Sequence, residues 1–320
     1  MQLITDMAGR AVELPDRINK IYAPSPYAST LLMSLCPEKL CGLFFPIEEY
    51  QKPFLNPCLL DLPVIGKITE FEAIKKANPD VILIWGDKSN PIHPKSEKAM
   101  AELGIPHIYA CCDELVDLRD YPAIYRFLGQ VLGIEERAEK LANYCEKTLI
   151  EISELVNSIH PQHRPRVYYA EGKDGTQTEY SHSLHAHLLN LIGDVNVHRG
   201  NLEGHAGMEQ LTEEQLLAYD PEVIIVWLEE AYERIMYKNW MATASMKPRN
   251  DGNQKWQEIS AVKNNRVYLI PKEPFSYFDR PPCFMRILGL KWLLTICYPE
   301  IYKKNFEEEK AEFLKLFFEM

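Results

Sequence analysis

Long apolar runs are missing from this 320-residue chain. The longest strand-like runs, Val81–Trp85 and Val223–Leu228, are far shorter than the roughly 20 residues that cross a bilayer. The opening MQLITDMAGR contains Asp6 and Arg10 and lacks the apolar stretch of about 7–15 residues found in a signal peptide. We therefore expect no membrane span. We also expect either a cytoplasmic protein or a mature form without its leader.

Positive charge is also scarce, because 35 Lys and Arg stand against 46 Asp and Glu, a formal net charge of −11. A chain this acidic has no excess of cations with which to displace the counterions of nucleic acid. Apolar residues make up 46% and charged residues 25%, close to the average of soluble globular proteins. This composition excludes a disordered or fibrous protein, and the length predicts two domains or lobes.

Motifs of catalysis and of covalent cofactor attachment are missing as well. The 15 glycines are scattered, and the sequence contains no G-x-S-x-G, P-loop, G-x-G-x-x-G or H-E-x-x-H. Eight cysteines lie at positions 36, 41, 58, 111, 112, 145, 283 and 297, without a C-x-x-C pair. We expect mostly buried free thiols, no covalently bound cofactor and no enzyme activity.

Strand and helix patterns alternate along the chain, which predicts an α/β fold with parallel sheets. Two segments repeat the same plan: ANPDVILIW at 77–85 and YDPEVIIVW at 219–227. Each has a turn, a proline, an acidic residue and then a five-residue apolar run that ends in Trp, with a helix pattern before it. The repeat predicts two lobes built from one supersecondary unit.

The longest helical pattern lies between the two halves. Apolar residues from Ile134 to Val156 recur at steps of three and four, and no Gly or Pro interrupts them. A helix over 135–158 would be about 36 Å long at 1.5 Å per residue. We therefore expect an N-terminal α/β lobe over 1–120, a connecting segment over 121–160 and a C-terminal α/β lobe over 161–320. A stiff connector of this kind limits hinge motion between the lobes.

This arrangement resembles the helical-backbone class of periplasmic substrate-binding proteins of ABC importers. The resemblance covers nearly the whole chain. It rests on the order and spacing of several segments more than on any single motif. Its segments are ITDMAGRAVELPDRINKIYA, GKITEFEAIKKANPDVILIW, SLHAHLLNLIGDVNV, QLTEEQLLAYDPEVIIVW, WQEISAVKNNRVYLIP and RPPCFMRILGLKWLLTICYPE. It implies two Rossmann-like lobes joined by one rigid helix, with the ligand in a cleft between them.

The resemblance also implies a function. The protein would capture an iron chelate, a siderophore or haem, and deliver it to an ABC permease dimer with its ATPase. It would act as a monomer, in the periplasm or as a cell-surface lipoprotein. Other metal species remain open, namely cobalamin, a nickel chelate or a molybdate-type oxyanion. A cytoplasmic metal- or cofactor-handling enzyme on a chelatase-like scaffold is the alternative from another class.

Ligands of open α/β sheets bind beyond the carboxyl ends of the strands, and aromatic residues stand at several of these ends. An aromatic-lined cleft suits a planar or apolar-rimmed chelate. Core packing is the competing interpretation for the two Trp residues and Tyr27, and loop packing for Tyr50, whose phenolate could otherwise ligate ferric iron. The aromatic candidates for ligand binding are Tyr27, Tyr50, Trp85, Tyr169, Trp227 and Tyr277.

Two arginines near the last predicted strand are further candidates. Arg280 stands in SYFDRPP, and Arg286 follows on the next helix. A guanidinium group there can hold carboxylate, catecholate or oxyanion groups in a bidentate manner, so both suit an anionic ligand. A structural ion pair of Arg280 with Asp279 or Glu273 is the competing interpretation.

Histidines are the metal-ligand candidates. His182, His185, His187, His198 and His205 fall within 24 residues, more than half of the nine in the chain. His182 lies in a loop before a predicted helix, and His93 lies in a Pro-rich loop after Val81–Trp85. These two are our candidate metal ligands, against the alternative of solvated surface histidines.

The repeat places two glutamates at equivalent positions. Glu72 and Glu214 each lie seven residues before the proline of their repeat, Pro79 and Pro221. In the family that the chain resembles, one acidic residue of each lobe meets arginines of the permease. The resemblance thus makes these two glutamates the candidate permease-docking residues, and ordinary solvated helix positions are the alternative.

Overall fold

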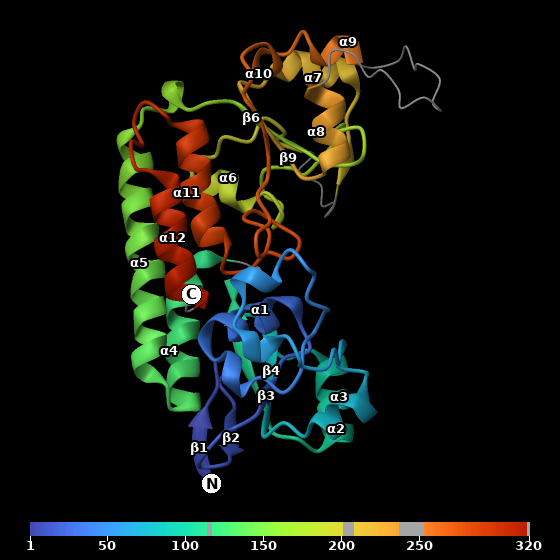
Figure 1. Ribbon diagram of the computed structural model, residues 1–320, viewed down its shortest axis with the longest axis vertical. Coiled ribbons are helices and arrows are strands. Elements are labelled where there is room, and N and C mark those ends of the chain that lie inside the picture. Colours follow the sequence, from blue (N-terminus) through green and yellow to red (C-terminus); the bar gives the residue numbers. More distant parts are fainter. Residues whose placement is uncertain (114–116, 201–207, 237–252, 319–320) are drawn as a thin grey trace.

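The computed structural model describes residues 1–113, 117–200, 208–236 and 253–318. Helices and strands alternate through both halves, as the sequence predicts (Figure 1). The strands are β1 Gln2–Thr5, β2 Ala11–Leu14, β3 Ile21–Tyr22, β4 Val81–Asp87, β5 His107–Cys112, β6 Val167–Ala170, β7 Gln177–Thr178, β8 Glu209–Gln210, β9 Val223–Val226 and β10 Val267–Leu269.

The α-helices are α1 Pro26–Leu35, α2 Phe71–Ala77, α3 Pro94–Leu103, α4 Tyr121–Leu132, α5 Glu135–Ser158, α6 His187–Leu191, α7 Glu213–Tyr219, α8 Glu229–Met236, α9 Asn253–Trp256, α10 Ser260–Lys263, α11 Arg286–Cys297 and α12 Phe306–Phe318. Short 3-10 turns cover Pro37–Lys39, Lys52–Phe54, Pro57–Leu59, Leu118–Asp120 and Pro161–His163. Within these described residues, no helix is both long and apolar enough to cross a bilayer.

Each half contains one three-stranded parallel sheet. The order is β3-β4-β5 in the N-terminal half and β10-β9-β6 in the C-terminal half. The repeated apolar runs form β4 and β9, the central strand of each sheet, and both are buried along Val81–Ile84 and Val223–Val226. A strand that is buried on both faces must be apolar throughout, which explains why neither run alternates with polar residues.

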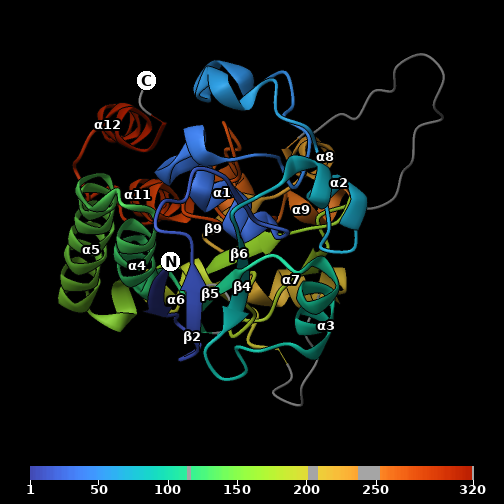
Figure 2. The ribbon, with the colours of Figure 1, turned by 90° about the horizontal axis from the view of Figure 1, so that it is seen from below.

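The long helix is confirmed as α5, Glu135–Ser158, and it lies along one side of the molecule between the two sheets (Figures 1 and 2). Its buried residues follow the apolar stripe of the sequence pattern, from Ala138 to Val156. The α/β fold with two lobes is therefore as predicted. The C-terminal helices α11 and α12 also pack here, α11 against α5 and α12 against α1.

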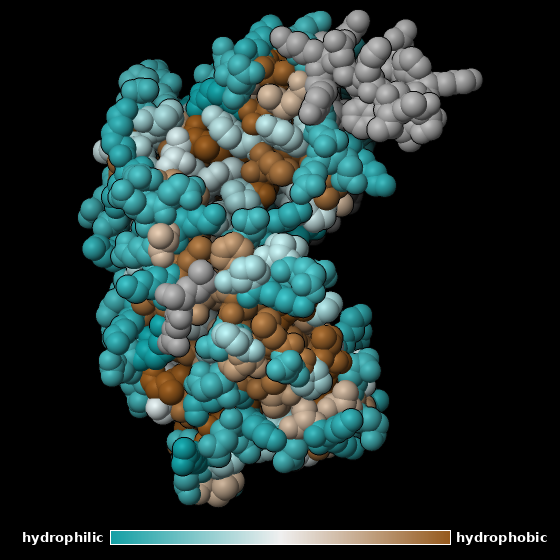
Figure 3. Space-filling model, viewed as in Figure 1, coloured by the Kyte–Doolittle hydropathy of each residue, from teal (hydrophilic) through white to brown (hydrophobic). Residues whose placement is uncertain are grey.

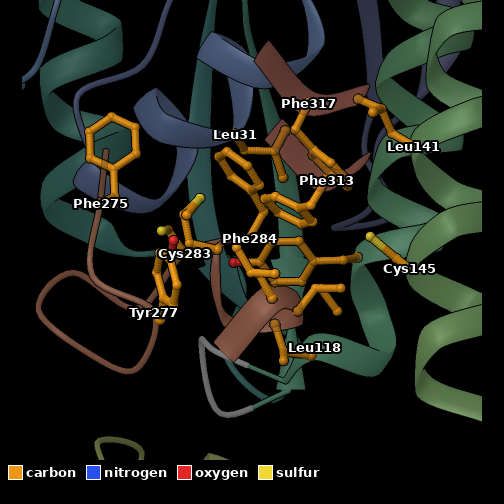
Figure 4. Close-up of a cluster of buried hydrophobic side chains, with 14 of the residues drawn as sticks. Leu31, Leu118, Leu141, Cys145, Phe275, Tyr277, Cys283, Phe284, Phe313 and Phe317 are labelled. Carbon is orange, nitrogen blue, oxygen red and sulfur yellow. The ribbon is translucent and has the colours of Figure 1, made fainter. Parts of the chain in front are cut away.

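An aromatic cluster joins α12 to the helices beside it (Figure 4). Phe313 and Phe317 stack with ring centroids 4.2 Å apart, and Phe284 stacks on Phe317 at 5.3 Å. Leu141 and Cys145 of α5 belong to the same buried core. The last helix of the chain thus shares one buried core with α5. All eight cysteines are free, and six of them are buried.

Local differences from the predicted elements occur at their ends. The helix α3 begins at Pro94, because His93 caps it and its side chain accepts a hydrogen bond from the backbone N–H of Lys95. The helix α6 covers only His187–Leu191. Before it, Ser183 Oγ accepts a hydrogen bond from the backbone N–H of His185 in a turn.

Candidate functional site

A cavity of about 280 Å³ lies between the two halves of the molecule. Residues of the segment 45–51 line it from the N-terminal half, and Trp227 and residues of the segment 270–281 line it from the C-terminal half. The surface is notched between the lobes on the side away from α5 (Figure 3). Because the C-terminal lining follows strands β9 and β10, the cavity lies where open α/β sheets bind ligands.

The two sides of the cavity touch each other. Gln51 Nε2 donates a hydrogen bond of 2.7 Å to the carbonyl oxygen of Pro274. The rings of Phe45 and Phe275 meet edge to face, with centroids 6.0 Å apart. Tyr50 lines the cavity and is 44% exposed. Aromatic side chains of both lobes therefore surround a space that a small ligand can enter.

Larger cavities of about 430, 530 and 550 Å³ lie elsewhere. Two lie between α5 and the segment that joins α11 to α12, where Lys304 pairs with Glu151 at 2.9 Å. The third lies at the amino edge of the C-terminal sheet, around Arg166. None of the described strands has its carboxyl end at these cavities, so the interlobe cavity is the candidate ligand site.

Arg280 lines the interlobe cavity and faces three carboxylates. Its Nε and Nη2 donate to Glu171 Oε1 at 3.0 and 2.7 Å, and Nη2 also donates to Glu179 Oε1 at 3.2 Å. Asp279 Oδ2 lies 3.4 Å from Nε. The guanidinium carbon lies 4.9 Å from the ring centroid of Trp227. These contacts hold the guanidinium group in one orientation.

The backbone of Arg280 is unusual, since its φ of 58° falls in the left-handed region that disfavours large side chains. Such strained positions cluster at binding sites, where the surrounding structure maintains them. Of the two structural partners that sequence analysis left open, Asp279 is in contact with Arg280. The pairs with Glu171 and Glu179 were not predicted.

Beneath Arg280 lies a network of buried acids. The side chains of Glu171, Glu179 and Asp279 are 0% exposed. Burial raises the pKa of Glu171, and the guanidinium of Arg280 offsets only part of this effect. Burial acts to lower the pKa of His185, but its 2.7 Å hydrogen bond to Asp279 Oδ2 prevails and raises it.

On the N-terminal side, Tyr27 and Trp85 meet with ring centroids 6.2 Å apart, and Trp85 meets Tyr121 at 6.0 Å. Burial raises the pKa of Tyr27, and the carboxylate of Asp279 adds to this effect. Asp279 of the second lobe therefore acts electrostatically on Tyr27 of the first lobe. Two residues chosen from sequence at separate strand ends are brought together here.

Arg286 lies deeper and is 0% exposed. Its Nη2 lies 3.2 Å from His187 Nδ1 at the start of α6. Burial lowers the pKa of His187 to about 4, and the charge of Arg286 contributes to this shift. Arg286 does not line the cavity, so its charge acts on a ligand only from a distance.

Tyr169 and Tyr277 are both completely buried. The Tyr169 ring packs on Phe278 at 4.7 Å, and its hydroxyl lies against the carboxylate of Glu171. Tyr277 donates to the carbonyl oxygen of Glu273 at 3.2 Å. Neither lines the interlobe cavity, so both belong to the core beneath it.

The candidate metal ligands lie apart from each other. His182 is exposed, and His93 caps α3 on the surface of the N-terminal half. Of the other clustered histidines, His198 is buried and bonds to Glu209 and Tyr219, whereas His205 lies outside the described residues. The described part of the chain contains no group of three or more His, Cys, Asp or Glu side chains that could hold a metal ion.

The docking candidates are both exposed, Glu72 on α2 and Glu214 on α7. Glu214 pairs with Lys255 at 2.9 Å. Figures 1 and 2 place both helices on the side of the molecule away from α5. The two helices that carry these glutamates, one from each lobe, thus lie on the same side of the molecule (Figures 1 and 2).

Sequence analysis missed Glu171 and Glu179, because it searched the strand ends for aromatic and cationic residues only, and it named His185 without selecting it. Glu171 directly follows β6, so the same strand-end rule would have selected it. Glu179 and the loop residue Phe45 lack such a signal. Tertiary packing alone brings them to the site.

Comparisons with known proteins agree with this architecture. The family described as "Periplasmic binding protein" matches residues 119–274. An ABC transporter solute binding protein from Sulfurospirillum deleyianum has a similar structure, with a TM-score of 0.85 and 34% identity over 99% of this chain and 95% of that one.

Two curated proteins are more distant relatives. The molybdate-binding protein MolA of Haemophilus influenzae is 20% identical over 94% of this chain and 86% of its own length. The Fe(3+)-citrate-binding protein YfmC of Bacillus subtilis is 21% identical over 68% of this chain and 62% of its own length. These proteins bind solutes and are not enzymes, as expected for this chain too. The chain belongs to the periplasmic solute-binding proteins of ABC transporters.

Proposed function

We propose that this substrate-binding component of an ABC importer captures a compact metal chelate in the interlobe cavity, with an iron complex as the first candidate. One observation carries the proposal: Trp227 and Arg280 face the aromatic segment 45–51 across the cavity. Aromatic walls pack on the organic part of a chelate, and a few polar groups orient it. The distant relative that binds Fe(3+)-citrate supports an iron complex.

The size of the cavity supports a compact ligand. Its volume of about 280 Å³ is near the lower end of the roughly 300–1,000 Å³ usual for small-molecule pockets. Haem or cobalamin would require the lobes to move apart, and the helix α5 with its packed neighbours α11 and α12 opposes a wide opening. We therefore consider a small siderophore complex a better candidate ligand than a macrocycle.

A molybdate-type oxyanion is the second candidate, because one relative is a molybdate-binding protein. Arg280 would be its ligand. However, Glu171, Glu179 and Asp279 already face the guanidinium group. An oxyanion would have to compete with buried carboxylates for the same donors, so the charge distribution favours the chelate.

The ligand test is metal analysis and visible absorption of the protein purified from its own host, followed by titration of the emptied protein. We expect bound iron, a charge-transfer band and quenching of tryptophan fluorescence by a ferric chelate. Trp227→Leu should weaken binding about tenfold or more, while Trp85→Leu, which changes a residue outside the cavity, should weaken it less. A Soret band would indicate haem, and molybdenum without iron would contradict the proposal.

We also propose that Glu72 and Glu214 dock the protein on the two halves of the permease, while the protein acts as a monomer in the periplasm or on a lipid anchor. Two separated charges on one side of the molecule fix orientation and speed encounter. Glu72→Arg combined with Glu214→Arg should abolish uptake by cells and leave ligand affinity unchanged. Glu300→Arg, at a 91% exposed glutamate side chain, is the matched control. Normal uptake by the double variant would contradict docking through these carboxylates.

A further inference from the structure

One wall of the interlobe cavity is a loop, the segment 45–51, which we call the strap. Four of its residues are exposed, namely Pro46, Glu48, Glu49 and Tyr50. Among the described residues, the backbone N–H groups of residues 45–50 donate no hydrogen bond to any other part of the N-terminal half. The strap is therefore attached to its own lobe by its two ends and by the partly buried side chains of Phe45 and Ile47.

Gln51 joins the end of the strap to the opposite lobe. Its side chain is 5% exposed, although it directly follows the exposed Tyr50. Its Oε1 accepts a hydrogen bond of 2.8 Å from the backbone N–H of Glu48, and its Nε2 donates one of 2.7 Å to the carbonyl oxygen of Pro274. Because a backbone N–H can bond only to the oxygen of the amide, the contact with Glu48 turns the amide donor toward Pro274.

The segment 271–277, which receives this bond, is closed on itself. Tyr277 donates to two of its carbonyl oxygens, through the backbone N–H to Pro271 at 3.0 Å and through the hydroxyl to Glu273 at 3.2 Å. The carbonyl oxygen of Pro274 lies between them in the chain and bonds to the other lobe instead. Internal hydrogen bonds thus give the acceptor of Gln51 a fixed position.

A second contact between the strap and this segment is aromatic. The rings of Phe45 and Phe275 meet edge to face at 6.0 Å. Phe275 is 3% exposed, and its ring also lies 6.3 Å from that of Phe318 in α12. Helix α12 packs against α1 and belongs to the same buried core as α5. The segment 271–277 is therefore anchored in the core, and the strap is the wall with fewer attachments.

From this geometry we infer that the strap controls entry to the interlobe cavity and that Gln51 is the latch that holds it closed. The inference rests on the proposed function, since it specifies how a ligand reaches the same cavity. Separation of the lobes would have to deform the 24-residue helix α5 and its packed neighbours. Release of the strap breaks the hydrogen bond to Pro274 and the ring contact with Phe275 and leaves the helices in place.

Gln51→Glu tests the latch with little change in size. It keeps an oxygen acceptor for the N–H of Glu48 and places a second oxygen against the carbonyl oxygen of Pro274, so the two repel each other. Stopped-flow tryptophan fluorescence, with a ferric trihydroxamate as the probe, measures both rate constants. We expect association and dissociation to be about five- to tenfold faster, the factor that corresponds to one hydrogen bond. Kd should change by less than about threefold, because the bond is lost in the free and the bound protein alike.

Two further variants complete the kinetic test. Phe45→Leu removes the ring contact with Phe275 and keeps Gln51, so both rate constants should rise by a smaller factor, about two- to threefold. It does not depend on a buried carboxylate being tolerated. Gln162→Glu makes the same chemical change at an exposed glutamine in the turn Pro161–His163 and should leave both rate constants unchanged.

Hydrogen exchange tests the strap without any ligand. The backbone N–H groups of Glu48 and Gln51 are hydrogen-bonded within the strap. In Gln51→Glu, peptides that contain them should lose protection about fivefold, whereas the segment 271–277 should exchange as in the native protein. Equal loss of protection in both segments would show that the lobes separate as a whole, which contradicts a strap that moves by itself.

The outcomes separate the latch from the proposed function. Faster dissociation with unchanged association would show that Gln51 only contacts the ligand, and it would overturn control of entry. Unchanged exchange in the strap of Gln51→Glu would overturn the latch, whether or not the probe binds. If the native protein fails to bind the trihydroxamate while the strap of the variant exchanges faster, the latch stands and the iron-chelate function is contradicted.

Discussion

The two halves of the molecule use one repeated strand for different chemistry. In both sheets the repeated apolar run forms the central strand and is followed by a tryptophan near the interlobe region. Trp85 packs among aromatic rings, those of Tyr27 and Tyr121. Trp227 instead packs against the guanidinium of Arg280. The tryptophan of the first half thus has aromatic neighbours, and the tryptophan of the second half has a charged neighbour. We call these surroundings the aromatic side and the charged side.

This difference shows that the repeat sets the position of a side chain but not its role. Parallel strands carry their last residues to the same edge of the sheet, so both tryptophans stand at that edge, although only Trp227 lines the cavity. Their neighbours come from segments that the repeat does not include, such as Asp279-Arg280 after β10 and Tyr121 at the start of α4. The surroundings of each tryptophan can therefore be tested separately.

The largest expected effect is on the charged side. Arg280→Ala would leave three buried carboxylates without their cation, and removal of one partner from a buried ion pair costs about 3–5 kcal/mol. Urea denaturation should show this loss in the free energy of unfolding. Lys272→Ala, at an exposed pair, should cost less than about 1 kcal/mol. Similar losses of unfolding free energy in the two variants would show that the buried ion pairs stabilise the protein no more than the exposed one.

Next in size is the effect on the aromatic side. Trp85→Ala removes a partly buried ring from two aromatic neighbours, and we expect it to lower the free energy of unfolding by about 2 kcal/mol. Trp227→Ala should cost about 1 kcal/mol in stability but weaken the ligand more, because only Trp227 lines the cavity. If ligand affinity fell more for Trp85→Ala than for Trp227→Ala, the ligand would have to lie beside Trp85 and Tyr27 and not in the cavity at Trp227.

A smaller effect is expected from pH, with opposite signs for two histidines of the charged side. His187 has its pKa lowered to about 4 by burial. The unfolded chain, with a pKa of about 6.5, takes up this proton first, so the contribution of His187 to stability is present above pH 6.5 and is lost as the pH falls toward 4. His185 has a raised pKa, so its contribution is present below about pH 6.5 and is lost as the pH rises through the folded-state pKa.

Urea titrations between pH 4 and 8 can measure these two contributions. His187→Gln should flatten the loss of stability on the acid side. His185→Gln should remove the added stability near pH 6. A change of the same sign in both variants would contradict the assignment of the two environments.

The smallest effect on stability is expected at the docking candidates. Glu72→Gln and Glu214→Gln are surface changes, so each should alter the free energy of unfolding by no more than about 0.5 kcal/mol. The exposed pair of Glu214 with Lys255 makes its cost slightly the larger of the two. A loss of several kcal/mol at either position would mean that the residue stabilises the fold of its lobe. A substitution there could then not test docking.

Much of the fold could be predicted, because its signals are local. Apolar runs after a turn with proline predict β4 and β9, and a stripe without Gly or Pro predicts α5 over its full length. Helix ends were harder, since His93 caps α3 through a side-chain contact with Lys95 that periodicity does not reveal. The short α6 begins only after a turn in which Ser183 Oγ accepts a hydrogen bond from the backbone N–H of His185.

The candidate site was predicted only in outline. The strand-end rule located Tyr27, Trp85 and Trp227 near the interlobe region, but it could not distinguish lining residues from core residues. Tyr277 follows β10 as closely as Arg280 does, yet its side chain points into the core while Arg280 lines the cavity. Side-chain direction in a loop depends on packing against distant segments.

The order of the residues alone was sufficient for two parallel sheets, a helical connector and a set of strand ends that face one space, since periodicity and turn chemistry act within a few residues of each other. The charge of that space was decided only by the tertiary structure. Glu171 and Glu179 lie 109 and 101 positions before Arg280 in the chain, and folding brings them to its guanidinium group. Whether an arginine presents its charge to a ligand depends on which acids are buried beside it, and no local pattern encodes that contact.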